Sequence, residues 1–226
     1  MESFNKLKKS SLPNRQHLFG LFSHSLVKRF LAFILTIKKP VDRQRFFVEV
    51  IIFIFLVIWS LSFLTKSADS ADSINWIHAF LDRVNLVFHE AGHIFLFWAG
   101  TFMHAFGGTF LQCLIPLIIM GHFLRQKDNY SASLMFWWFG ENFIDVAPYI
   151  YDAKARILTL LGGGTGQDHP EGHDWYVLLN LMNSLDNHAI IAGTVNTFGK
   201  LFILLSLIWA GGILYKKFLW LKIQQV

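Results

Sequence analysis

The sequence contains a single cysteine, Cys113, among 226 residues. One thiol excludes an intramolecular disulfide and any metal cluster built from several cysteines. Charge is also scarce, because only 15% of the residues are Asp, Glu, Lys or Arg, whereas a soluble domain usually has about 25%. Most of this charge lies in the first 45 residues and in short connectors, which leaves long apolar runs between them. This distribution is typical of a polytopic membrane protein.

Hydrophobic side chains are abundant, at 54% of the residues, and the formal net charge is +5. Basic residues flank the apolar runs, so we expect membrane lipids with anionic headgroups, and not nucleic acid, as the partner of this charge. The tract Gly162-Gly163-Gly164 lacks the lysine of a phosphate-binding loop, so it does not indicate nucleotide binding.

We expect an all-α fold with four to five transmembrane helices and an N-terminal amphipathic interfacial helix. Residues 1–45 form a basic N-terminal segment. Over 17–37 bulky apolar side chains are mixed with Lys28 and Arg29, which predicts an amphipathic helix on the membrane surface. Residues 46–226 form a transmembrane metallopeptidase-like domain. Its apolar runs predict helices over 46–64, 76–103, 131–151 and 188–215, with a shorter helix over 175–184.

The segment after residue 103 leaves two topologies open. Gly107-Gly108 is expected to break the preceding helix. Residues 109–124 are apolar but contain Pro116, so they fit either a kinked span or a re-entrant pair. Five spans would put the C-terminus outside the cell, whereas four spans with a re-entrant segment would bring it back inside.

The strongest motif is HEAGH at residues 89–93, inside an apolar run. Residues four apart share a face of a helix, so His89 and His93 can present imidazole nitrogens to one metal ion. Glu90 is close enough to take a proton from water and to pass it on. Such side chains are costly in a membrane unless they bind a metal or other polar groups. A packing cluster in which His89 and Glu90 hydrogen-bond with Asn85 is the alternative interpretation.

A catalytic zinc site usually needs a third protein ligand. If the HEAGH helix and the helix over 131–151 begin at the same membrane surface, Asp145 lies at the depth of the motif, so we expect it to be the third ligand. A position behind the ligands, where it would hold a histidine tautomer, is the alternative for Asp145. His173, in the glycine-rich loop over 152–175, is an alternative third ligand. Its neighbour Asp174 is expected to cap the short helix that follows.

Asn142 lies on the same expected helix as Asp145. Its side-chain amide could donate a hydrogen bond to a tetrahedral oxyanion, which would make Asn142 catalytic beside Glu90. It could equally cap a turn that is broken at Pro148.

HEAGH in a membrane helix resembles the site-2 protease class of intramembrane zinc metallopeptidases. In that class two histidines and a glutamate lie on one membrane helix and an aspartate on a later helix completes the site, which implies zinc ligands at His89 and His93 and a general base at Glu90. The aspartate of that class lies in a motif with Asn, Pro and Asp-Gly, whereas FGENFIDVAPYIYDA arranges these residues differently and has no Asp-Gly. Much of residues 85–180 also resembles a family of uncharacterised bacterial membrane proteins.

We therefore expect a zinc-dependent metalloprotease that hydrolyses peptide bonds of membrane-embedded or juxtamembrane substrates, located in the bacterial inner membrane. Basic residues before the first span, such as Arg43 and Arg45, favour a cytoplasmic N-terminus. A non-enzymatic metal-binding membrane protein, such as a transporter or an assembly factor, would use the same residues and is the alternative. A catalytically inactive relative that binds membrane partners is a third hypothesis.

Overall fold

The computed structural model describes residues 27–38, 40–69 and 76–224, without the side chains of 76–79. The chain divides into two units, Met1–Thr36 and Ile37–Val226. In the first unit residues 27–34 are helical, which matches part of the expected interfacial helix; the part of that helix before residue 27 lies outside the described residues. All further elements belong to the second unit.

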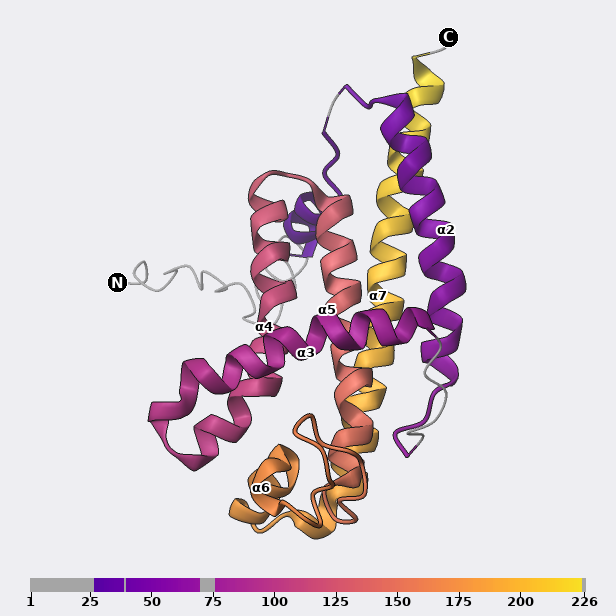
Figure 1. The fold of residues 1–226 in the computed structure, drawn as a ribbon. Helices are drawn as coiled ribbons and strands as arrows, with labels where there is room; N and C mark the ends of the chain where they lie inside the picture. Colours follow the sequence, from indigo (N-terminus) through magenta and orange to yellow (C-terminus); the bar gives the residue numbers. More distant parts are fainter. Residues whose placement is uncertain (1–26, 39, 70–75, 225–226) are drawn as a thin grey trace, which may run out of the picture. The chain divides into compact units, whose positions relative to one another are not determined.

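The second unit is built from helices joined by short turns and by one long loop (Figure 1). In chain order they are α2 (Arg43–Thr65), α3 (Trp76–Leu96), η1 (Phe97–Ala99), α4 (Thr101–Arg125), α5 (Asn129–Asp152), η2 (Pro170–Gly172), α6 (Asp174–Leu181), η3 (Leu185–Asn187) and α7 (His188–Ile223). The prediction of an all-α fold is confirmed. The most extensive packing joins α5 to α7, α3 to α4 and α4 to α5.

Among the described residues, three helical segments are long and apolar enough to cross a membrane: Arg43–Thr65, Thr101–Arg125 and Leu185–Ile223. The prediction of four to five spans is therefore too high. The two other long helices are too polar to qualify, since α3 carries three charged residues and α5 is interrupted by buried polar residues such as Asn142 and Glu141. Length and composition thus support membrane association with a smaller number of spans.

The HEAGH helix is shorter than expected, because α3 ends at Leu96 and the chain turns through η1 and Gly100. Gly100 has φ +89°, a conformation that glycine adopts at little cost. The prediction that Gly107-Gly108 breaks a helix is wrong, since both lie inside the continuous helix α4. They serve close packing instead: a Cβ atom on Gly92 would lie 2.0 Å from the Gly107 carbonyl oxygen.

Helices α2, α5 and α7 share an apolar core. It consists of the buried residues Leu56, Phe63, Trp137, Ile144 and Ile203. The α5 and α7 backbones approach closely, since a Cβ atom on Gly140 would lie 2.9 Å from the Gly199 carbonyl oxygen. These three helices form the support against which the other elements are placed.

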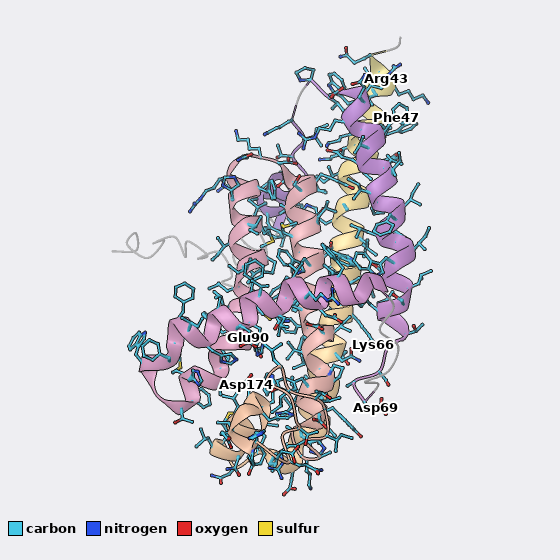
Figure 2. The ribbon with its side chains drawn as sticks, viewed as in Figure 1. Arg43, Phe47, Lys66, Asp69, Glu90 and Asp174 are labelled. Carbon is cyan, nitrogen blue, oxygen red and sulfur yellow. The ribbon has the colours of Figure 1, made fainter. Side chains whose placement is uncertain are left out.

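Ionic contacts join three segments at one end of this unit. Arg45 of α2 pairs with Asp128, in the turn between α4 and α5, at 2.6 Å. The buried Glu49 of α2 pairs with Lys217 near the end of α7. The beginning of α2, the α4–α5 turn and the end of α7 therefore lie together. Figure 2 shows Arg43 at this end, whereas Glu90 lies far from it.

Replacing Gly92 by alanine is expected to force α3 away from α4, because the new methyl group would meet the backbone of Gly107. Strain of this kind costs about 1–3 kcal/mol, which thermal unfolding of the detergent-solubilised protein would register as a lower midpoint. Gly121→Ala is the matched control, since it lies in α4 and its methyl group would meet nothing within 4 Å. Equal midpoints for the two variants would contradict the close packing of α3 on α4.

Candidate metal centre

His89 and His93 lie on successive turns of α3, and each ring uses one nitrogen to bond to a neighbouring helix. His89 Nδ1 lies 3.0 Å from the side-chain oxygen of Gln112 in α4. His93 Nδ1 lies 2.8 Å from the backbone carbonyl oxygen of His104 in α4. Both partners are oxygen acceptors, so each Nδ1 carries the proton and donates it. In the neutral rings this leaves a lone pair on each Nε2.

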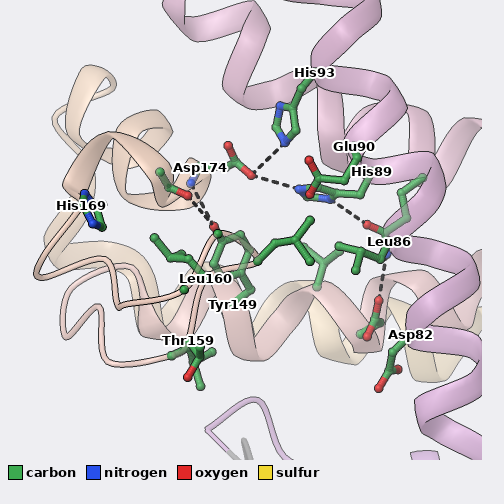
Figure 3. Close-up of a pocket in the computed structure, with 18 of the residues that line it drawn as sticks. Asp82, Leu86, His89, Glu90, His93, Tyr149, Thr159, Leu160, His169 and Asp174 are labelled. Atoms are coloured by element: carbon green, nitrogen blue, oxygen red, sulfur yellow. Dashed lines mark hydrogen bonds and ion pairs between the residues drawn. The ribbon is translucent and has the colours of Figure 1, made fainter.

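Those two Nε2 atoms converge on one carboxylate oxygen, Oδ2 of Asp174 (Figure 3). The distance from His89 Nε2 is 3.0 Å, and the distance from His93 Nε2 is 3.3 Å. Burial alone would raise the pKa of the Asp174 carboxyl, but its contacts with His89 and His93 outweigh burial and hold that pKa below its ordinary value. The site therefore favours an ionised carboxylate beside two imidazoles.

Three atoms that carry lone pairs approach this closely only when positive charge lies between them, either as protons on the rings or as a metal ion. Zinc bonds of about 2.0–2.1 Å in a tetrahedral arrangement separate neighbouring ligand atoms by about 3.3 Å. The spacings of Asp174 from His89 and His93 are close to this value. Two imidazoles and a carboxylate are also a usual set of protein ligands for catalytic zinc. The arrangement fits a zinc ion.

A cavity of about 830 Å³ opens beside these three side chains. Glu90 lines it together with His89 and His93, and one ligand atom of each of these three residues lies within 4.8 Å of the others. The opposite wall is the loop over 158–163. If a metal ion were held here, a glutamate next to its histidine ligands would have the placement of a general base.

The loop before α6 positions Asp174 through a set of hydrogen bonds. His173 is fully buried and caps α6, where its Nδ1 accepts from the Tyr176 backbone N–H at 3.2 Å. Its Nε2 lies 3.2 Å from Asp152. The Tyr149 hydroxyl accepts from the Asp174 backbone N–H at 3.1 Å. The Asp174 carboxylate therefore lies at the start of a helix whose first turn is held by hydrogen bonds with His173 and Tyr149.

His173, the alternative third ligand, is not among the residues that line the cavity. Both of its ring nitrogens are engaged, one with Asp152 and one with the backbone of α6. Burial lowers the pKa of His173 below its ordinary value, against the opposing effect of Asp152. A neutral, buried imidazole that caps a helix has a structural role.

Asp145, the expected third ligand, lines the same cavity, but Gln112 bridges it to His89. Its Oδ2 accepts from the Gln112 side-chain nitrogen at 2.8 Å and from the Asn85 side chain at 3.2 Å. Because a carboxylate only accepts, it orients the Gln112 amide so that the amide oxygen faces His89. The geometry corresponds to the alternative interpretation, in which Asp145 helps to hold a histidine tautomer. The structure places Asp174, and not Asp145, against both imidazoles.

Asn142 does not face the cavity. It is fully buried, and its amide nitrogen donates to the Trp138 carbonyl oxygen at 3.0 Å. It is not among the residues that line the cavity. The expected hydrogen bond from Asn142 to an oxyanion has no support in this placement, since the amide packs inside α5.

Sequence reasoning did not identify two residues of this site: Gln112, which binds His89, and Asp174, which contacts both imidazoles. Gln112 is a lone polar residue in an apolar run, which was a signal, since a buried amide needs a polar partner. The prediction that Asp174 caps the short helix is wrong, because His173 is the cap and Asp174 is the first residue of α6. The lack of a side chain at Gly108 leaves room for the His89 ring, since a Cβ atom at this position would lie 2.5 Å from His89 Nε2.

Gln112→Leu is expected to weaken the binding of added zinc by about 10- to 100-fold, the usual cost of losing the partner that orients a histidine ligand. Titration of the metal-free protein in detergent against a zinc-binding dye measures this affinity. Asn142→Leu is the matched control, because it removes a buried amide from α5 without touching either imidazole. Equal zinc affinities for Gln112→Leu and the unmodified protein would contradict the role of Gln112.

No protein-family model, no curated protein and no solved structure matches this chain, so the interpretation of the site depends on its own geometry.

Proposed function

We propose that the protein is a zinc-dependent membrane metallopeptidase in which His89, His93 and Asp174 hold the metal. The observation that carries the proposal is the convergence of both histidine Nε2 atoms on one carboxylate oxygen. The HEAGH motif, with Glu90 in the adjoining cavity, adds the general base that hydrolysis requires. The resemblance to site-2 proteases is consistent with this proposal, with the carboxylate ligand supplied by a loop-borne helix.

Zinc bound at this site supplies a Lewis acid that polarises a carbonyl group and makes water more acidic. Glu90 takes the proton from the attacking water and returns it to the leaving amine. Gln112 and the His104 carbonyl keep the protons of the two rings on Nδ1, so that both Nε2 lone pairs are free to hold a metal ion. Asp174 neutralises part of the positive charge.

The lining of the cavity supports a proposal for the class of substrate. Its walls combine the polar residues of the site with the apolar loop residues Leu158, Leu160 and Leu161. An extended segment of a membrane protein offers both the peptide bond and the apolar side chains that such walls accept. We therefore propose membrane-embedded or juxtamembrane peptide segments as substrates.

The proposed topology places the basic end of the unit in the cytoplasm of a bacterial cell. Arg45 is joined there to the α4–α5 turn, which carries Lys127, and Lys217 is joined to Glu49. Clustered Lys and Arg residues favour the cytoplasmic side of the inner membrane. The N-terminus would then be cytoplasmic, and the cavity would open toward the opposite surface.

Glu90→Gln is expected to keep zinc bound and to lose at least about 100-fold in hydrolysis, because the amide cannot accept the proton of water. Zinc content, together with cleavage of fluorescein-labelled casein by the zinc-loaded protein in detergent, measures both properties. Glu171→Gln is the matched control. Glu171 also lines the cavity, but it is exposed and does not belong to the cluster of His89, Glu90 and His93. Casein cleavage that survives Glu90→Gln would contradict the peptidase proposal.

A second candidate function is ion or proton conduction, which a cluster of carboxylates beside the site favours. Asp82, Glu141 and Asp145 each place a ligand atom within 4.8 Å of the others, and Gln112 links Asp145 to His89. Carboxylate and histidine clusters within membranes occur along ion pathways. Zinc binding without hydrolysis in the unmodified protein would favour this function over the peptidase.

A further inference from the structure

Helix α3 has its polar and apolar faces reversed relative to a helix of a water-soluble protein. The side chains of Phe80, Val87 and Ile94 are 65%, 67% and 71% exposed. These residues are seven apart, so they form one stripe along the helix. The opposite face carries Asn85 and His89, which are bound in polar contacts with α4 and α5. The apolar face is therefore outside and the polar face inside.

The exposed stripe continues beyond the helix. Phe97 and Trp98 in η1 are 69% and 73% exposed. None of the described residues covers this surface, which is longer than the isolated exposed apolar residues that are usual on a soluble protein. An apolar surface of this length beside three candidate membrane spans fits the acyl chains of a lipid bilayer.

The direction of α3 differs from that of the long apolar helices. Figure 1 shows α3 running across α2, α5 and α7 instead of along them. Two of these, α2 and α7, are candidate spans, whereas α3 is not. If α2 and α7 cross the membrane, α3 must lie more nearly in its plane.

The position of α3 along the length of α2 can also be seen. In Figure 2 Lys66 and Asp69, just beyond the end of α2, lie toward the same end of the unit as Glu90, and Arg43 lies at the other end. A lysine and an aspartate that end an apolar span mark the border of the hydrocarbon layer. Arg83, exposed at the side of the apolar stripe, can reach lipid phosphates from this level.

We propose that α3 lies along the membrane surface on the side of Lys66, with the stripe of Phe80, Val87, Ile94 and Trp98 in contact with lipid acyl chains. A helix in this position has the properties of interfacial amphipathic helices: one apolar face in the lipid and one polar face turned away from it. The polar face of α3 holds the HEAGH histidines against Gln112 of α4 and Asp174 of α6. This inference about lipid contact does not require a bound metal.

The orientation restricts the substrate, a consequence that rests on the proposed function. Every residue of a helix in the membrane plane lies at nearly the same depth, so Glu90 lies close to one membrane surface and not at the bilayer centre. The scissile bonds would then lie near the end of a membrane span, in a juxtamembrane segment, where less of the substrate helix has to unwind.

Spin labels test the orientation. In a Cys113→Ala background, single cysteines at Phe80, Val87 and Ile94 are labelled with a nitroxide, and the protein is reconstituted in phosphatidylcholine–phosphatidylglycerol vesicles. Relative accessibility to oxygen and to a water-soluble nickel chelate gives the depth of each label. We expect all three labels to be accessible from lipid and to share one depth.

The matched control is the series Phe47, Ile54 and Leu61 on α2, which are also exposed, apolar and seven apart. If α2 spans the membrane, Ile54 should be the deepest, by about 10 Å relative to the two others, from the rise of 1.5 Å per residue. Ala91, on the apolar face of α3, replaces any α3 position whose variant does not reconstitute.

Two results would overturn the proposal: depths on α3 that change by about 10 Å from one label to the next, or three labels that are accessible only from water. Failure of the peptidase proposal would leave the depths unchanged, since they need neither zinc nor hydrolysis. The two proposals can therefore fail separately.

Discussion

The geometry of the site depends on two hydrogen bonds that hold the protons of His89 and His93 on Nδ1. One goes to the Gln112 side chain and the other to the backbone of His104, both in α4. They turn both Nε2 lone pairs toward Asp174, where two imidazoles and a carboxylate meet at the spacing of zinc ligands. Without these bonds the rings could rotate or change tautomer, and the three ligand atoms would no longer converge.

Close contact between α3 and α4 is the condition for both hydrogen bonds. The contact depends on glycines, since side chains at Gly92 or Gly107 would meet the backbone of the other helix, and Gly108 leaves room for the His89 ring. A loop fixed by buried His173 then brings Asp174 to the same point. Helix packing, and not the motif alone, thus determines how the site is completed.

The sequence predicted an all-α fold and the positions of most helices, because apolar runs are local signals. The four-residue spacing likewise predicted that His89 and His93 face the same way, and both rings contact Asp174. The structure places Asp174, and not the expected Asp145, against both imidazoles, and the reason is geometric. The choice of Asp145 assumed that the HEAGH helix and the following long helix run side by side from one surface, whereas α3 runs across α5 (Figure 1). Asp174 is the first residue of α6, and the loop that leads to it follows a course that depends on long-range contacts, such as those of Tyr149. Such contacts leave no periodic pattern in a sequence.

The central claim is that His89, His93 and Asp174 bind one zinc ion. X-ray absorption at the zinc edge, recorded on the zinc-loaded protein and on Asp174→Ala, tests it directly. The account predicts two imidazole ligands with oxygen or nitrogen donors at about 2.0–2.2 Å in the unmodified protein, and weaker binding with a changed oxygen contribution in the variant. A spectrum without paired imidazoles, or one that Asp174→Ala leaves unchanged, would contradict the account.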